Sequence, residues 1–172
     1  MESGDFPEFD NLARLGKGFM RKRFSVVCLL VLGVASVAFG TDYALVVNPS
    51  NPVKEISLTD LAKIFKAKTT AWANGKSITI VLREPASPST KFIIEKVLGS
   101  SFEDGKSLLA SASRKSTVPV VFAESDADIL KIVQDDPGAV GVIDVYNITS
   151  GVNVVKIDDK QPFDPGYVLK GR

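Results

Sequence analysis

The sequence predicts a single α/β domain with a mostly parallel central β-sheet that is flanked by helices. Two observations lead to this class. Short β-branched apolar runs alternate along the chain with segments whose apolar residues recur at helical spacing. The chain is also 172 residues long, 45% hydrophobic and 24% charged, which is typical of one globular domain and not of a disordered or fibrous protein.

The first 40 residues are expected to lie outside this domain. Residues 20–40 have the layout of a secretory signal peptide, with a basic cluster at 21–23, an apolar run at 24–39 and a small-residue site that places cleavage after Gly40. A permanent membrane anchor is the alternative, although the run is slightly short for a span of about 20 residues. We interpret residues 1–19 as a disordered extension from an upstream start codon, which leaves open whether translation begins at Met1 or Met20.

The predicted domain covers residues 41–158 and is followed by a polar tail, 159–172. The whole chain has 21 basic and 20 acidic residues, of which five and four precede Thr41, so the exported part has 16 of each and no net charge. This balance argues against general affinity for nucleic acid or anionic membranes. We expect a periplasmic or secreted protein with no membrane span once the signal peptide has been removed.

Residue types also limit the chemistry of the exported domain. Cys28 is the only cysteine and leaves with the signal peptide, and the sequence contains no histidine. Disulfides, thiolate chemistry and imidazole catalysis are therefore excluded, and a metal would have to be held by carboxylates alone. The sequence predicts no cofactor, no metal site and no catalytic residue.

The elements follow one another as strands and helices with short connections. Apolar β-type runs predict strands at residues 43–48, 78–82, 118–122, 139–143 and 152–157. Helical spacing predicts helices that begin at Ser57, Ser87, Ser101 and Ser125, the second of which ends at Gly99. The segment from Asp158 contains Pro162 and Pro165, and we expect it to lie on the surface.

The stretch from 77 to 99 holds the strongest candidate for a functional site. It places Arg83 at the carboxyl end of a strand and Ser87, Ser89 and Thr90 at the amino end of a helix. Unpaired backbone N–H groups and the helix dipole favour an anion at such a position. Ligands of open α/β sheets also lie beyond the carboxyl ends of strands. We therefore hypothesise an oxyanion site at this loop.

The other helix starts differ from this one. Each of them has an acid three residues after its serine, in the pairs Ser57 with Asp60, Ser101 with Asp104, and Ser125 with Asp128. Such an acid partly neutralises the positive helix end, an effect worth roughly 0.3–1 kcal/mol. The turn that begins at Ser87 has no acid, so its positive end is left to meet a different anion.

A structural interpretation of the same loop stays open. In it Ser87 is only a helix cap, Ser89 and Thr90 are only solvated, and Arg83 pairs with Glu84 or another neighbouring acid. Ser87 as a nucleophile would lack a histidine base, which argues against an enzyme.

Two further candidates are given structural roles. Four acids in the second half of the chain could suggest a carboxylate metal site, but two open a helix and two close it, so we interpret them as solvated charges: Asp126, Asp128, Asp135 and Asp136. Trp72 is interpreted as a core side chain and not as a platform on which a ligand stacks.

Three segments resemble the substrate-binding proteins of phosphate ABC transporters. They are ISLTDLAKIFKAKTTAW at 56–72, ITIVLREPASPSTKF at 78–92 and DPGAVGVI at 136–143. The chain is most similar to short, single-domain, secreted members of that periplasmic-binding-protein-like superfamily. The resemblance covers most of residues 43–157 and implies the fold of a single periplasmic-binding-protein-like lobe.

The resemblance also implies site residues. In the full-length family an arginine at the end of this strand and a Gly-Ser-Gly-Thr turn contact phosphate between two lobes. Arg83 matches that arginine, Ser87 matches the serine and Ser89 the threonine, with Thr90 adjacent, while Ala86 and Pro88 stand in place of the glycines.

The implied function is an exported, non-catalytic module that binds an oxyanion, with phosphate as the expected anion. The alternative is a degenerate lobe that serves as a protein-interaction or structural module of the envelope. Tight binding on a single open face would require a second surface, from another copy of the chain or from an envelope protein.

Overall fold

The computed structural model describes residues 40–114 and 118–171. The predicted extension at 1–19 lies outside the described residues, as does the predicted signal peptide apart from Gly40. Within the described part, no helix is long and apolar enough to cross a membrane.

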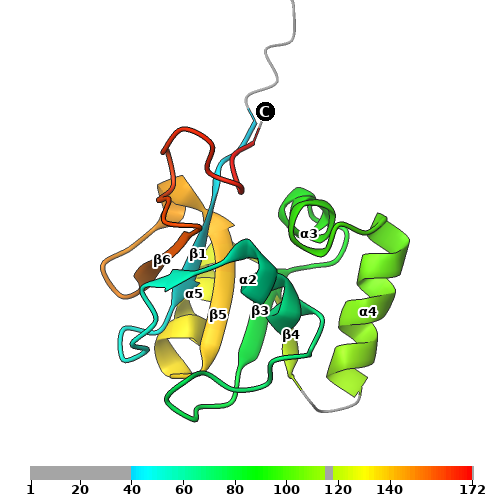
Figure 1. Ribbon diagram of the computed structural model, residues 1–172, viewed down its shortest axis with the longest axis horizontal. Coiled ribbons are helices and arrows are strands. Elements are labelled where there is room, and N and C mark those ends of the chain that lie inside the picture. The colour runs from blue at the N-terminus through cyan, green and yellow to red at the C-terminus, as the bar shows by residue number, and fades with distance from the viewer. Residues whose placement is uncertain (1–39, 115–117, 172) are drawn as a thin grey trace, which may run out of the picture. The chain divides into compact units, whose positions relative to one another are not determined.

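A six-stranded sheet with the order β2-β6-β1-β5-β3-β4 forms the centre of the domain (Figure 1). Its strands are β1 Tyr43–Val47, β2 Glu55–Ile56, β3 Thr79–Arg83, β4 Val120–Ala123, β5 Ala139–Asp144 and β6 Asn153–Ile157. Strand β3 pairs parallel with β4 and β5, and β2 pairs parallel with β6, whereas β1 is antiparallel to both β5 and β6. The predicted α/β class with a mostly parallel sheet is confirmed.

Helices cover both faces of this sheet, which is what buried parallel strands require. The helices are α2 Leu58–Phe65, α3 Pro88–Ile93 continued by the π-helical turn η1 Ile94–Leu98, α4 Phe102–Arg114, α5 Asp126–Asp135, and the short 3-10 helix η2 Val145–Asn147. One core lies under α2, α3, η1 and α4, and a second core lies under α5. Alternate residues of β1 enter the two cores, with Leu45 in the first and Val46 in the second.

The predicted helix from Ser87 to Gly99 is confirmed at both ends, although its second half widens into η1. Ser87 is its N-cap, and Gly99 ends it in the left-handed conformation with φ of 61°. Glycine adopts this conformation without steric strain, so its position in the sequence marks the helix end correctly. Strand β2 and helix η2 were not predicted, because elements of two or three residues are too short to show a period.

Trp72 is a core residue, as predicted. It is 7% exposed and its indole N–H donates to the carbonyl oxygen of Gly138 at 2.9 Å. This bond ties the connector before β3 to the residue that precedes β5.

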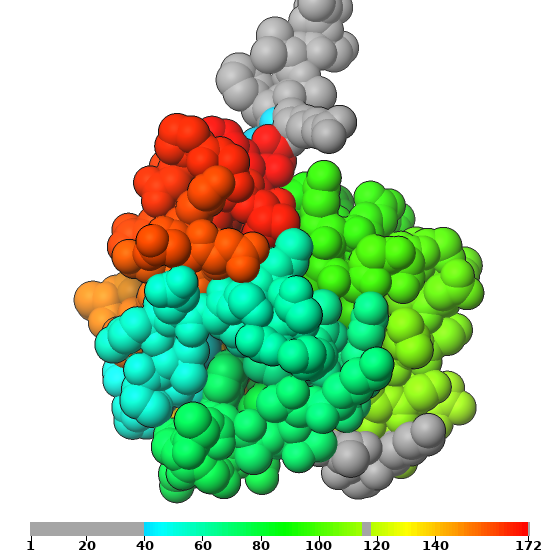
Figure 2. Space-filling view, viewed as in Figure 1, coloured from blue at the N-terminus to red at the C-terminus, as the bar shows by residue number. Residues whose placement is uncertain are grey.

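The prediction that the segment after Asp158 lies on the surface is wrong at two residues. Tyr167 and Leu169 are buried in the larger core, and the carbonyl oxygen of Leu169 accepts a hydrogen bond from the N–H of Tyr43 at 3.0 Å. Figure 2 shows the last residues, in red, as a continuous part of the domain surface. Two apolar side chains among polar neighbours are too few to show a pattern in the sequence, yet they are enough to anchor the segment.

The turn between β3 and α3 is fixed by Thr90. This side chain is 1% exposed, its hydroxyl donates to the carbonyl oxygen of Arg83 at 2.8 Å, and its N–H donates to the Ser87 hydroxyl at 3.2 Å. The helix start is therefore bonded back to the last residue of the strand, which fixes the distance between Arg83 and Ser87.

We expect Thr90→Val to lower the free energy of unfolding by about 1–2 kcal/mol, because the variant keeps the shape and removes a buried hydrogen bond. The control is Ser89→Ala in the same helical turn, which should change that free energy by less than about 0.5 kcal/mol because Ser89 is only half-buried. Urea unfolding of both variants measures the difference. Equal effects would show that the bond to Arg83 does not hold the turn.

A second prediction concerns Tyr167, whose buried hydroxyl lies near the backbone of Leu45 but makes no hydrogen bond of good geometry among the described residues. Burial raises the pKa of Tyr167, so above a pH of about 10 the unfolded chain loses this proton while the folded chain keeps it, and stability falls. At neutral pH, Tyr167→Phe should leave the free energy of unfolding unchanged or raise it by up to about 1 kcal/mol. Above a pH of about 10, the variant should lose less of that free energy than the unchanged protein does.

The measurement is urea unfolding at neutral pH and above pH 10. Tyr146→Phe is the control, because Tyr146 is 81% exposed and should show neither effect. A clear loss of stability in Tyr167→Phe at neutral pH would contradict the prediction.

Candidate functional site

A cavity of about 270 Å³ lies at the edge of the sheet where β3 and β5 end and the antiparallel β1 begins. The opposite direction of β1 brings Tyr43 beside Asp144, the last residue of β5. The starts of α3 and α5 and the short helix η2 complete the wall. The lining residues are Thr41, Tyr43, Arg83, Ser87, Pro88, Ser89, Asp126, Asp144 and Asn147. We call this space the first cavity.

The structure places three of the four predicted site residues on this cavity. Arg83 ends β3, and Ser87 and Ser89 come from the start of α3. Thr90 is the exception, because its side chain is buried and its hydroxyl proton is given to the carbonyl oxygen of Arg83. Thr90 therefore positions the site, and the role of the other three as ligands stays a prediction.

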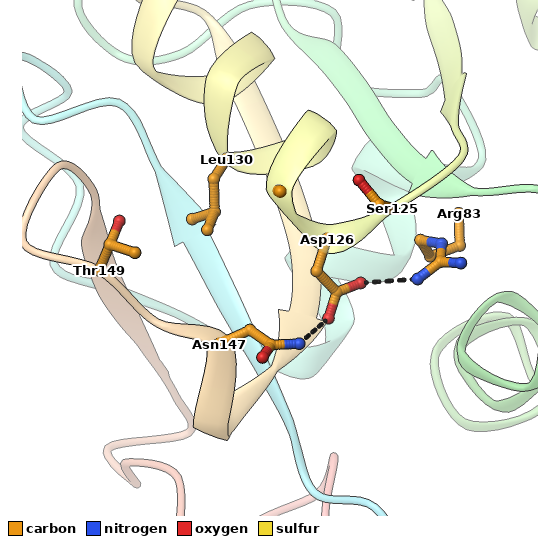
Figure 3. Close-up of a pocket in the computed structure, with 7 residues that line it drawn as sticks. Arg83, Ser125, Asp126, Leu130, Asn147 and Thr149 are labelled. Atoms are coloured by element: carbon orange, nitrogen blue, oxygen red, sulfur yellow. Dashed lines mark hydrogen bonds and ion pairs between the residues drawn. The ribbon is translucent and has the colours of Figure 1, made fainter.

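Arg83 forms an ion pair with the first residue of α5. Its Nη1 donates to Oδ1 of Asp126 at 3.3 Å, and its side chain is 33% exposed (Figure 3). The pair is single and long, and the Nε–H of Arg83 is buried with no acceptor among the described residues. An arginine side chain has five N–H donors, so this one has capacity for a further acceptor.

Asp126 is not the solvated charge that the sequence predicted. Its side chain is only 12% exposed, and its second carboxylate oxygen accepts from the N–H of Asp144 at 3.0 Å and from the amide of Asn147 at 2.8 Å. Figure 3 shows the carboxylate between Asn147 and Arg83. The carboxylate is thus bonded to three other elements. The sequence could not show this, because the partners are 18 to 43 residues away.

The helix caps explain why the start of α3 is different. At Ser57, Ser101 and Ser125 the hydroxyl accepts from the backbone N–H three residues on and donates its proton to the carboxylate of that same residue, at 2.6–2.8 Å. No acid stands in the first turn of α3, and the hydroxyls of Ser87 and Ser89 lie 3.2 Å apart. One O–H can satisfy the other oxygen, which leaves the second proton free for an acceptor in the cavity.

Tyr43 adds a donor that the sequence interpretation missed. Burial, followed by the nearby carboxylates of Asp144 and Asp126, raises the pKa of Tyr43, so its hydroxyl keeps its proton at neutral pH. Thr41, Asp144 and Asn147 were missed as well. The available signal for Thr41 and Asp144 was their position just before or just after a predicted strand, but which strand ends meet depends on the sheet order. Asn147 had no such signal, because it lies in η2, which was not predicted.

The charges of the cavity limit what it can bind. Its described lining holds one cation, Arg83, and two carboxylates, Asp126 and Asp144. An anion must therefore approach Arg83 and the hydroxyls while a carboxylate lies nearby, and an anion that carries a proton can donate it to that carboxylate. Within the described residues, no group of three or more cysteine, histidine or acidic side chains is placed to hold a metal ion.

Comparison with solved structures identifies similar folds. A protein from Clostridium perfringens, described as a phosphate ABC transporter substrate-binding protein and solved with bound phosphate, is 26% identical, with a TM-score of 0.55 over 69% of this chain and 45% of that one. An ABC-type phosphate transport receptor from Vibrio cholerae is 21% identical, with a TM-score of 0.60 over 76% and 54% of the two chains. PstS from Borrelia burgdorferi is 17% identical, with a TM-score of 0.58 over 77% and 55%.

The chain thus spans about half the length of the solved structures it matches. No curated protein sequence is significantly similar to it. The family model for the PBP superfamily domain matches residues 33–169, which is well over half of the chain. The resemblance found in the sequence is confirmed, and the chain belongs to the family of PBP superfamily domains.

Proposed function

We propose that this domain is an exported, non-catalytic module that binds an oxyanion, with phosphate as the expected anion. The main support is that Arg83 and the hydroxyls of Ser87 and Ser89 line the same cavity. Among the described helices that begin with a serine cap, only α3 has no acid in its first turn. These groups can donate several hydrogen bonds to one tetrahedral anion. The solved relative from Clostridium perfringens, which was crystallised with phosphate, supports the choice of anion.

The proposed contacts use side chains that line the first cavity and can donate to an anion. The anion would accept from Arg83, from one serine hydroxyl and from the hydroxyl of Tyr43. Pro88 occupies the first position of α3 and has no N–H, so the helix start offers fewer backbone donors than a turn with glycine would. The cavity is open on one side and its single cation is paired with Asp126, so we expect weak binding, with a Kd of the order of 1 mM.

The ion pair between Arg83 and Asp126 favours a second candidate function. An arginine that is already paired within the domain needs no ligand, and the strand-end face would then contact an envelope protein or a second copy of the chain. Export through the predicted signal peptide to the periplasm or the exterior belongs to both proposals. A phosphate-independent partner found by sedimentation of the full chain would favour this second function.

Replacing Arg83 tests the first proposal directly. We expect calorimetry of the full chain to detect phosphate binding in the millimolar range and Arg83→Gln to weaken it at least about tenfold, because the variant removes the only cation of the cavity. Arg114→Gln is the matched control, since this exposed arginine ends α4 and does not line the cavity. Unchanged circular dichroism would establish that both variants fold.

Two results would count against the proposal. Absence of any heat with phosphate, sulfate or arsenate up to millimolar concentrations would remove it. Equal phosphate binding by Arg83→Gln and the unchanged protein would move the site away from this loop.

The carboxylates generate a prediction about anion selectivity. At neutral pH phosphate carries at least one proton and sulfate carries none, so only phosphate can donate to Asp126 or Asp144, and sulfate meets uncompensated repulsion. We expect phosphate to bind about tenfold more tightly than sulfate at neutral pH. Asp144→Asn should narrow this ratio, because an amide can donate to sulfate. Competition calorimetry measures the ratio, and a preference for sulfate in the unchanged protein would contradict the expected role of the carboxylates.

A further inference from the structure

A second hollow of about 420 Å³ adjoins the first cavity. It is lined by Arg83, Ser125, Asp126, Ala127, Leu130, Asn147 and Thr149. Three of these residues, Arg83, Asp126 and Asn147, also line the first cavity. The two spaces therefore meet at the hydrogen-bonded row of side chains that Figure 3 shows running from Asn147 through Asp126 to Arg83.

The chemistry of the second hollow differs from that of the first. Beyond the shared residues it offers the apolar side chains of Ala127 and Leu130 from α5, with the hydroxyl of Thr149 on the opposite side (Figure 3). Ser125 also lines it, but the Ser125 hydroxyl is already bonded to the N–H and the carboxylate of Asp128. No lysine or second arginine is among the lining residues. The second hollow thus suits an uncharged, partly apolar group and not a second anion.

The volumes leave room for a ligand larger than a bare oxyanion. A water molecule occupies about 30 Å³ of the liquid, so an anion of five non-hydrogen atoms fills roughly 150 Å³ at most. The first cavity alone is larger than that, and the second hollow adds a space of the size that small organic groups occupy in binding sites. Inorganic phosphate would leave most of this space to water.

We propose that the preferred ligand is a small phosphomonoester, and this inference rests on the proposed function. Its phosphate lies against Arg83, Ser87 and Ser89 in the first cavity. Its uncharged organic group, of about the size of glycerol, crosses the shared row and lies against Ala127 and Leu130, with hydroxyl contacts to Asn147 and Thr149. At neutral pH a phosphomonoester has mostly lost the proton that inorganic phosphate keeps, so it cannot donate to a carboxylate as inorganic phosphate does. Its bridging ester oxygen carries less charge than a terminal phosphate oxygen and faces the Asp126 carboxylate with less repulsion, and the contacts of the organic group offset the lost proton.

The test is calorimetry of the full chain with inorganic phosphate, glycerol 3-phosphate and free glycerol. The expected result is that glycerol 3-phosphate binds at least about tenfold more tightly than inorganic phosphate, while glycerol alone gives no heat. Arg83→Gln should weaken both phosphate compounds. If inorganic phosphate binds and glycerol 3-phosphate binds no more tightly, this inference is overturned and the proposed function stands. If neither compound binds, the inference and the proposed function both fail.

Filling the second hollow locates the organic group. Ala127 and Thr149 are exposed, so Ala127→Phe and Thr149→Trp should fold normally. Each should bring the affinity for glycerol 3-phosphate to within about twofold of that for inorganic phosphate, with the affinity for inorganic phosphate unchanged. Thr59→Trp on α2, at an exposed threonine that lines neither space, is the control and should keep the full tenfold preference. A preference that survives both filling variants would overturn the assignment of this hollow.

Discussion

The hydrogen bonds of the Asp126 carboxylate are the interactions on which the carboxyl-end edge of the sheet depends. Asp126 stands at the first position of α5, and its two oxygens reach Arg83 at the end of β3, the N–H of Asp144 at the end of β5, and Asn147 in η2. A buried carboxylate needs such partners, because an unpaired charge at this depth would cost several kcal/mol. Each of the three elements is thereby held at a fixed position relative to the others.

The same carboxylate limits the binding chemistry. It orients Arg83 and also offsets its charge, so the cavity attracts an anion less strongly than an unpaired arginine would. The serine hydroxyls at the start of α3 carry no charge and are unaffected by this pairing. In the proposed function, recognition would therefore depend on donated hydrogen bonds as much as on charge.

Local rules explain how these hydroxyls are presented. In three helices the cap serine and the acid after it satisfy each other, whereas in α3 the cap serine meets a second serine. Thr90 then bonds the helix start to the last residue of β3, so the donors of the strand and those of the helix are held on one wall. The position of the two serine hydroxyls therefore follows from the four consecutive residues 87–90.

The chain covers about half the length of the related solved structures and still has two cores, one on each face of its sheet. Burial of Tyr167 and Leu169 adds the end of the chain to the larger core and ties it to β1. The first cavity and the second hollow are both open to solvent, so the proposed ligand would need no local opening of the fold to enter them.

The sequence by itself determined the order and type of the main elements, the helix caps, the core position of Trp72 and the loop that carries Arg83, Ser87 and Ser89. These features follow from periods, turn residues and contacts over three or four positions, which a single sequence displays directly. Only the tertiary structure decided that Tyr43, Asp126, Asp144 and Asn147 join this loop, and that Tyr167 and Leu169 are buried. Those contacts depend on the order of the strands and on the reversed direction of β1, and local patterns carry no information about which strands pair.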